Sequence, residues 1–178
     1  MEHTLRDFRQ SDFNSLWRID QQCFPPGIAY SRFELAAYIQ RRKSFTIVAE
    51  TGPLNRRKSD PLSPPPHELQ IIGFIVTETK ANVGHVISID VLPPARRAGI
   101  GSKLLQAAEL RLLERNCQTV VLETAVDNHS ALSFYKRHGY YVVNTIPRYY
   151  SNGVDALVLQ KDLRPAAEDV PAVLNTAR

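Results

Sequence analysis

The chain contains little cysteine. Its two cysteines, Cys23 and Cys117, lie far apart, and no Cys-x-x-Cys pair occurs among the 178 residues. Disulfide-stabilised secreted domains and structural zinc sites both depend on several closely spaced cysteines, and no cluster of His, Cys, Asp and Glu here has metal-ligand spacing. We therefore expect no disulfide framework and no metal. Both thiols should act as small buried hydrophobic groups, in a protein of the reducing cytoplasm.

Long hydrophobic runs are also missing. Charged residues at positions 2, 6, 7 and 9 leave no apolar stretch near the N-terminus of the kind that directs secretion. No apolar run elsewhere approaches the roughly 20 residues of a membrane-spanning helix. The sequence therefore predicts neither an export signal nor a membrane partner.

Charge of one sign is only slightly in excess. Lys and Arg number 22 against 18 Asp and Glu, a net charge of +4, and three of the cations are Arg56, Arg57 and Lys58. Nucleic-acid-binding proteins concentrate basic residues, often with aromatics, on one face, and no such pattern stands out here. Nucleic acid is therefore disfavoured as a partner, and a pocket for an anionic ligand accounts for the surplus equally well.

Length and periodicity indicate one layered α/β (α+β) domain over residues 1–163. The strands are expected at 5–8, 45–50, 69–79, 83–92, 119–126, 140–144 and 154–161. The helices are expected at 11–22, 31–41, 100–116 and 128–138. Ser11 is placed as the cap of the first helix, Ser31 with Glu34 as a capping box for the second, and Asp127 or Asn128 as the cap of the last.

Two segments do not read as regular structure. Residues 51–68 are rich in proline and polar side chains, which predicts a mobile loop inserted between two strands of the same domain. Residues 164–178 are rich in alanine, proline and polar residues, which predicts a flexible C-terminal tail.

The most informative motif is the turn Arg96-Arg97-Ala98-Gly99-Ile100-Gly101, between an expected strand and an expected helix. The first backbone N–H groups of a helix lack partners, and the helix dipole adds positive charge there. Glycine lets a ligand approach the backbone closely, and the arginines add fixed positive charge. The turn therefore predicts a site for a ligand that carries phosphate or pyrophosphate.

A second motif follows at matching spacing: Asn128-x-x-Ala131-x-x-Phe134-Tyr135-x-x-x-Gly139-Tyr140. Together the two motifs resemble those of the GNAT superfamily of acyl-CoA-dependent N-acetyltransferases. The resemblance implies a mixed, mostly antiparallel sheet of six to seven strands, flanked by about four helices and splayed at the strands that bind CoA. It implies acetyl-CoA as the cosubstrate.

Three further stretches most resemble the protein N-terminal acetyltransferases, including the RimI-type enzymes that modify ribosomal proteins. They are Gly84–Ile89, Leu122-Glu123-Thr124 followed by Asn128, and Arg148–Ala156. The resemblance therefore implies acetyl transfer to the N-terminal α-amine of a protein or peptide, by direct attack in a ternary complex. The long 51–68 insert and the loop from Phe24 to Tyr30 depart from the family pattern.

The resemblance assigns roles to particular residues. Glu123 and Tyr135 are the expected general base and general acid, and Tyr30, Tyr149 and Tyr150 are expected to hold the acceptor. The carbonyl is expected to be polarised by a backbone N–H near Val91. The residues expected to bind the cofactor are Ile89, Asp90, Val91, Arg96, Arg97, Ala98, Gly99, Ile100, Gly101, Ser102, Asn128 and Tyr135.

Each assignment has an alternative. Glu123 can instead face solvent or pair with an arginine, and Tyr135 can be a core aromatic. The three acceptor tyrosines can simply pack against neighbouring chain, and the turn at Gly99 can be an ordinary loop. At the level of function, the alternatives are a lysine ε-amine or small-molecule amine acetyltransferase of the same fold, and a non-catalytic CoA-binding module.

Overall fold

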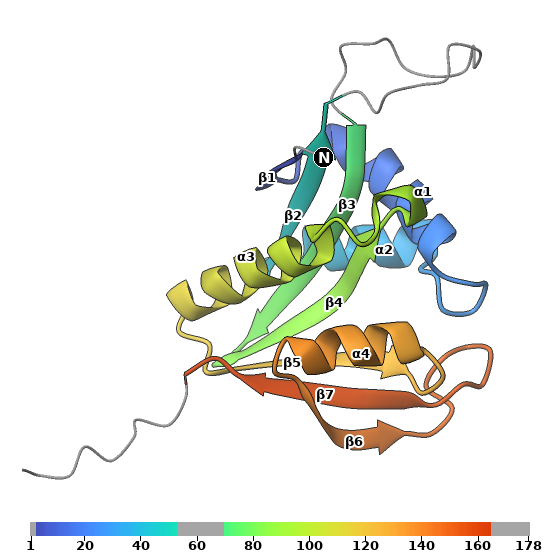
Figure 1. Ribbon diagram of the computed structural model, residues 1–178, viewed down its shortest axis with the longest axis vertical. Coiled ribbons are helices and arrows are strands. Elements are labelled where there is room, and N and C mark those ends of the chain that lie inside the picture. Colours follow the sequence, from blue (N-terminus) through green and yellow to red (C-terminus); the bar gives the residue numbers. More distant parts are fainter. Residues whose placement is uncertain (1–2, 53–69, 165–178) are drawn as a thin grey trace, which may run out of the picture.

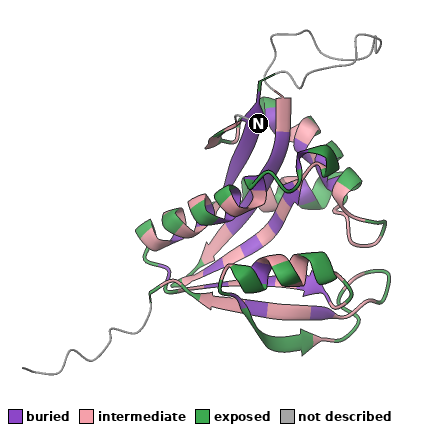
Figure 2. Cartoon of the chain, viewed as in Figure 1, coloured by how far each residue is buried: buried purple, intermediate pink, exposed green. Residues whose placement is uncertain are grey.

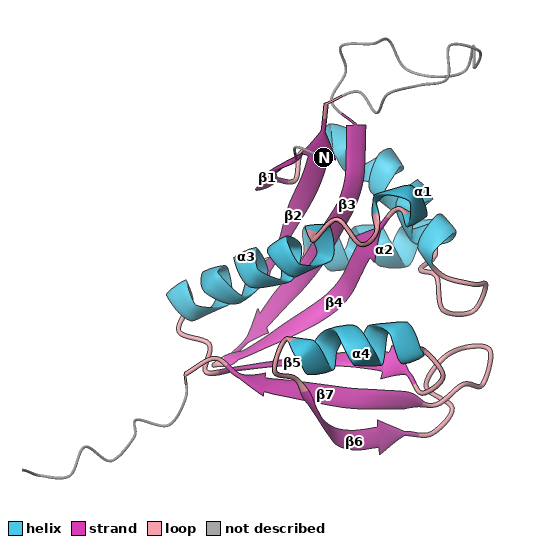
Figure 3. Cartoon of the chain, in the orientation of Figure 1, coloured by secondary structure: helices cyan, strands magenta, loops and turns pink. Residues whose placement is uncertain are grey.

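A computed structural model describes residues 3–52 and 70–164 as a seven-stranded mixed sheet with helices on both faces (Figures 1 and 3). The predicted insert at 51–68 and tail at 164–178 lie outside the described residues, except for 51–52 and 164. The strands are β1 (His3–Asp7), β2 (Ser44–Thr51), β3 (Gln70–Lys80), β4 (Val83–Val91), β5 (Thr119–Ala125), β6 (Tyr141–Ile146) and β7 (Ala156–Asp162). The α-helices are α1 (Phe13–Cys23), α2 (Arg32–Gln40), α3 (Ile100–Glu114) and α4 (His129–Arg137).

The strands follow the order β1-β2-β3-β4-β5-β7-β6, and every pair except β4–β5 is antiparallel. The parallel pairing is short: Val83–Val86 of β4 pair with Thr119–Leu122 of β5. Beyond it the two strands diverge (Figure 1). The predicted splay in a mostly antiparallel sheet is therefore confirmed, and it leaves one edge of β4 open.

A β-bulge in β4 lies where the splay begins. Val86 pairs with Thr77 and Ser88 pairs with Val76, so Ile87 is an extra residue on this strand. A bulge shifts the alternation of side chains between the faces of a sheet. Ser88 therefore lies on the sheet face that carries Val76, while Val86, before the bulge, packs in the cluster on the other face.

Each face of the sheet has its own hydrophobic core. Helix α3 covers one face through Ile100, Leu104, Leu105, Ala108 and Leu112, all of which are buried. Helices α1 and α2 cover the other face, where Leu16, Ile19 and Leu35 pack on Val48, Phe74 and Val76. Burial is greatest in β2 and β3, whereas β6 is exposed (Figure 2).

Side-chain caps begin two of the four α-helices in the described residues, α2 and α4. The predicted capping box is present: the Glu34 N–H donates to Ser31 Oγ at 3.2 Å, and Glu34 Oε2 accepts the Ser31 N–H at 2.9 Å. The predicted Ser11 cap is wrong, because a short 3₁₀ turn (Gln10–Asp12) precedes α1. Asp12 organises this turn by accepting the Arg9 N–H at 2.7 Å and two hydrogen bonds from Arg6.

Candidate active site

The turn before α3 has the backbone geometry of an anion site. Gly99 has φ +77° and Arg97 has φ +65°, both left-handed. The first helical hydrogen bond of α3 runs from the Lys103 N–H to Gly99 O, at 3.1 Å. Within the described part of the chain, no N–H from Arg97 to Ser102 donates to a backbone carbonyl. These unpaired N–H groups can donate to the oxygens of an anionic ligand at the N-terminal end of α3, where the helix dipole is positive.

Some side chains of the turn and of the first turn of α3 have structural partners. Arg96 Nε donates to Val91 O at 2.9 Å and so fixes the turn to β4. Ile100 is buried in the core under α3, and Ser102 Oγ lies 2.9 Å from His138 Nε2 on α4. The turn can therefore bind a pyrophosphate through its backbone, and its residues fit the CoA predicted from sequence.

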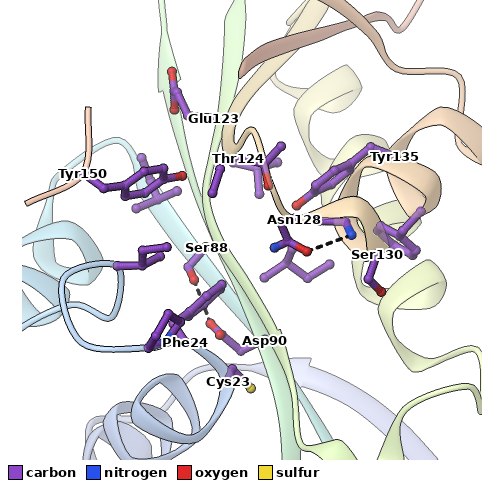
Figure 4. A pocket seen from close by; sticks show the side chains of 18 of the residues that line it. Cys23, Phe24, Ser88, Asp90, Glu123, Thr124, Asn128, Ser130, Tyr135 and Tyr150 are labelled. Carbon is purple, nitrogen blue, oxygen red and sulfur yellow. Dashed lines mark hydrogen bonds between the residues drawn. The ribbon is translucent and has the colours of Figure 1, made fainter. Parts of the chain in front are cut away.

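A cavity of about 550 Å³ opens where β4 and β5 separate (Figure 4). Most of the predicted site residues line it: Tyr30, Ile89, Asp90, Val91, Arg96, Gly101, Glu123, Asn128, Tyr135, Tyr149 and Tyr150. The other residues predicted to bind the cofactor, Arg97, Ala98, Gly99, Ile100 and Ser102, belong to the turn and the first turn of α3 next to Gly101. The structure thus gathers residues from four separate stretches of sequence around one space.

Backbone groups of β4 line the open edge. The Leu92 N–H donates to Ile72 O on the β3 side at 2.9 Å. Because backbone direction alternates along an antiparallel strand, the N–H and C=O groups of Ile89 and Val91 face the opening. Asp90 instead has its backbone toward β3 and its side chain toward α1. Val91 O already accepts hydrogen bonds from Arg96 Nε and the Cys23 thiol, so the Val91 N–H and the backbone groups of Ile89 are the ones that can pair with an extended ligand.

Helix α4 begins at the cavity. Asn128 Oδ1 accepts the Ala131 N–H at 3.1 Å, which selects Asn128 rather than Asp127 as the cap. This bond fixes the Asn128 side chain at the cavity wall opposite β4 (Figure 4). Its amide nitrogen can donate to a ligand there.

Glu123 has a partner that sequence reasoning missed. Its Oε2 lies 2.6 Å from Nε2 of His85, and the two side chains are 19% and 32% exposed. His85 on β4 pairs with Val121 of β5, so Glu123, two residues further on, projects from the same face. In the described part of the chain its ionic partner is this histidine and not an arginine, and its side chain stays partly exposed to solvent. A carboxylate and an imidazole at this distance can share and relay a proton.

Tyr135 occupies the opposite wall of the same cavity. Its side chain is 6% exposed and packs against the rings of Phe134 and Tyr140, with centroids 5.2 and 5.5 Å away. The hydroxyl points toward the cavity and the β4–β5 opening (Figure 4). Burial, and secondarily the negative charge of Asp90, raises the pKa of Tyr135 above its usual value. The hydroxyl therefore stays protonated at neutral pH and is available as a donor.

Two loops frame the remaining side of the cavity. The α1–α2 loop places Tyr30, whose hydroxyl donates to Ile87 O at 3.3 Å. The β6–β7 loop carries Tyr149 and Tyr150, whose rings meet edge-on at 5.0 Å. The loops touch each other, since Ser151 Oγ donates to the Gly27 carbonyl at 3.0 Å. The three tyrosines predicted to hold the acceptor thus lie together at one side of the cavity.

Sequence reasoning also missed part of the lining. His85 was missed as the partner of Glu123. The cavity-lining residues that were not predicted include Phe24, Pro25, Ile28, Ser88, Thr124, Phe134 and Asn152. Cys117 is buried as predicted, but Cys23 is only partly buried and lines the cavity. Its thiol donates to Val91 O at 3.4 Å, and burial raises its pKa to about 11.

Other kinds of site are not seen in the described residues. No group of three or more His, Cys, Asp or Glu residues in this part of the chain is placed to hold a metal ion. None of its helices is long and apolar enough to cross a membrane.

The turn before α3 gives a direct test of ligand binding. We expect Gly99→Val to weaken CoA binding by about tenfold or more, because a branched side chain at φ +77° forces the backbone N–H groups out of place. Gly153→Val is the matched control, since Gly153 also has a positive φ (+84°) and open space around its Cα but lies in the β6–β7 loop. Calorimetric titration with CoA measures both, and equal affinities in the two variants would refute the turn as the pyrophosphate site.

The comparisons with known proteins agree with this geometry. The Acetyltransferase (GNAT) family profile matches residues 13–140, so the chain belongs to this family and is an acetyltransferase. It is 27% identical over 175 residues to the N-alpha-acetyltransferase of Sulfurisphaera tokodaii, covering 91% of this chain and 94% of that protein. It is 42% identical over 81 residues to human N-alpha-acetyltransferase 30, covering 46% of this chain and 22% of the human protein.

A solved structure extends the likeness over nearly the whole fold. A chain of the NatC complex bound to Gag peptide and CoA superposes with a TM-score of 0.70 at 25% identity, covering 92% of this chain and 100% of that chain. The mixed α/β GNAT fold expected from the sequence is therefore confirmed.

Proposed function

We propose that this enzyme transfers the acetyl group of acetyl-CoA to the N-terminal α-amine of a protein or peptide. One observation carries the proposal: Glu123, which is paired with His85, and Tyr135 line a single cavity at the β4–β5 splay. That cavity has an anion-binding turn on one side and the two tyrosine-bearing loops on the other. The names of two relatives, one that covers most of the chain and one that is 42% identical over 81 residues, support the α-amine as acceptor.

The chemistry requires little from the base. An α-amine has a pKa of about 7.7–8.0, so much of it is already neutral near pH 8. Glu123, paired with His85, takes the proton that the amine loses, directly or through a water molecule. The amine nitrogen bonds to the thioester carbon, and the backbone N–H of Val91 at the open edge stabilises the negative charge on the carbonyl oxygen.

Collapse of that intermediate breaks the carbon–sulfur bond. The electron pair leaves with the sulfur, and Tyr135 donates a proton or hydrogen bond to the thiolate. Cys23 is the cavity's own thiol, and its raised pKa of about 11 keeps it protonated and a poor nucleophile. We therefore propose direct attack in a ternary complex, with no acyl-cysteine intermediate.

A three-peptide panel tests the choice of acceptor. One peptide has a free N-terminus and no lysine, the second has a blocked N-terminus and one lysine, and the third has both amines. With acetyl-CoA and the full chain, we expect α-acetylation of the first and third peptides, with no ε-acetylation. A lysine ε-amine has a pKa of about 10.4 and needs a stronger base or a more desolvating site. Product on the blocked peptide alone would show a lysine acetyltransferase, and CoA binding without any product would show a non-catalytic module.

The remaining aspects of function are part of the same proposal. The separated free cysteines are consistent with a reducing, cytoplasmic location. A RimI-type preference for ribosomal-protein N-termini stays a prediction, and screening the first acceptor residue in the same assay tests it.

A further inference from the structure

Asp20 on α1 is fully buried, yet it is not among the residues that line the cavity. Its main-chain carbonyl accepts the Phe24 N–H at 3.1 Å. Its carboxylate Oδ2 accepts the Tyr30 N–H at 2.9 Å. Phe24 and Tyr30 stand at the two ends of the α1–α2 loop. The bond to Phe24 is the last backbone bond of α1, whereas the bond to Tyr30 depends on the Asp20 carboxylate.

A second side chain completes the attachment. Gln21 Nε2 donates to Asp20 Oδ2 at 3.0 Å and to Tyr30 O at 2.8 Å. Both backbone groups of Tyr30 are therefore bound to the end of α1. The Tyr30 hydroxyl reaches Ile87 O at the bulge of β4. The position of this tyrosine in the cavity thus depends directly on Asp20 and Gln21.

The loop forms one wall of the acceptor side. Phe24, Pro25, Ile28 and Tyr30 line the cavity, and Pro25 O accepts the Ile28 N–H at 3.1 Å within the loop. Gly27 contacts the other loop, and a Cβ atom at this position would lie 2.9 Å from Asn152 Cβ. A shift of the α1–α2 loop would therefore change the space between the two loops.

Asp20 is an unfavourable residue for stability alone. Burial raises its pKa to about 6, and its Oδ1 has no hydrogen-bond partner among the described residues. The nearby Asp90 carboxyl, 1% exposed, has its own pKa raised to about 8 by burial and by Asp20. Buried carboxyl groups with an unpartnered oxygen cost free energy of folding. The Asp20 carboxylate in return accepts hydrogen bonds from the Tyr30 N–H at the end of the loop and from Gln21, which itself donates to the Tyr30 carbonyl.

We propose that Asp20 is a positioning residue for the acceptor, acting through its carboxylate, which fastens the Tyr30 end of the α1–α2 loop. This inference rests on the proposed function for the identity of the acceptor. The loss of its carboxylate should weaken peptide binding, while CoA, held by the turn before α3 and by α4, should bind unchanged.

Steady-state kinetics with the full chain test the inference. In Asp20→Ala we expect the peptide KM to rise about 10- to 100-fold, the usual effect of one charge-assisted hydrogen bond. The kcat and the Kd of CoA should stay within about twofold. Asp20→Asn keeps an acceptor oxygen for the Tyr30 N–H and should restore most of the KM. Gln21→Ala, at an exposed position, should raise the KM to a smaller extent without affecting folding.

Asp12→Ala is the matched control, because Asp12 is also buried but binds Arg6 and the Arg9 backbone away from the loop. A peptide KM that stays unchanged in folded Asp20→Ala, or that rises equally in Asp12→Ala, would overturn the inference. A loss of CoA affinity in Asp20→Ala as large as the rise in its peptide KM would overturn the inference as well.

Amide hydrogen exchange separates this inference from the proposed function. The segment 24–30 should exchange faster in Asp20→Ala than in the wild type, and Asp12→Ala should leave it unchanged. This readout needs no turnover, so it holds even if the wild type acetylates no peptide, an outcome that would contradict the proposed function alone. Unchanged exchange in Asp20→Ala would show that Asp20 does not fasten the loop.

Discussion

Replacing Tyr135 with phenylalanine is expected to lower kcat by about 10²- to 10⁴-fold, with little change in CoA affinity. The substitution removes only the hydroxyl, and the ring keeps its packing against Phe134 and Tyr140. Without the hydroxyl, the thiolate leaves with no proton donor in a largely buried site. Initial rates at saturating acetyl-CoA and peptide, with a CoA titration, measure the effect.

Tyr140→Phe is the control for this prediction. Tyr140 is also a buried tyrosine with a raised pKa, but its hydroxyl donates to Glu109 at 2.9 Å, away from the cavity lining. Its removal should leave kcat nearly unchanged. An unchanged kcat in Tyr135→Phe would remove this tyrosine from the chemistry and favour its role as a core aromatic.

Replacing Glu123 with glutamine is expected to lower kcat/KM by about 10²-fold near pH 7. Glutamine has the same size and can still accept a hydrogen bond from His85, but it cannot take a proton. The defect should shrink as the pH rises past about 8, because solvent then deprotonates the α-amine before it binds. A pH series of kcat/KM for wild type and variant measures this trend.

His85→Ala gives an independent check on the same pair. It removes the partner 2.6 Å from Glu123 and should lower kcat/KM in the same direction. The double variant should lose less than the product of the two single effects, since the residues act as a unit. A Glu123→Gln defect that is the same at every pH would show that Glu123 does not deprotonate the amine.

Local sequence signals predicted the parts of the site that depend on a single element. The Ser31–Glu34 capping box, the Asn128 cap and the Gly99 turn all involve residues within a few positions of one another. Backbone N–H groups at the start of α3 follow from helix geometry itself. The turn and both motif-bearing helices were therefore predicted from the sequence.

The residues that the sequence did not reveal depend on pairing across the sheet. The meeting of His85 and Glu123 requires the register of β4 against β5, which no local pattern defines. The bulge at Ile87 turns Ser88 and Asp90 toward α1, and alternation alone would not predict that shift. Ser11 failed as a cap because it lies inside the 3₁₀ turn Gln10–Asp12, which Asp12 organises through Arg6 and the Arg9 N–H.

A pair of bisubstrate analogues tests the central claim most directly, namely that one cavity joins CoA and an α-amine across the β4–β5 splay. In one analogue an acetyl bridge links the CoA sulfur to the α-amine of a short peptide, and in the other it links CoA to a lysine ε-amine of an N-terminally blocked peptide. We expect the α-linked analogue to bind at least about 100-fold more tightly than CoA alone. The ε-linked analogue should gain much less affinity over CoA. Equal affinities of both analogues and CoA, or tighter binding of the ε-linked analogue, would contradict the central claim.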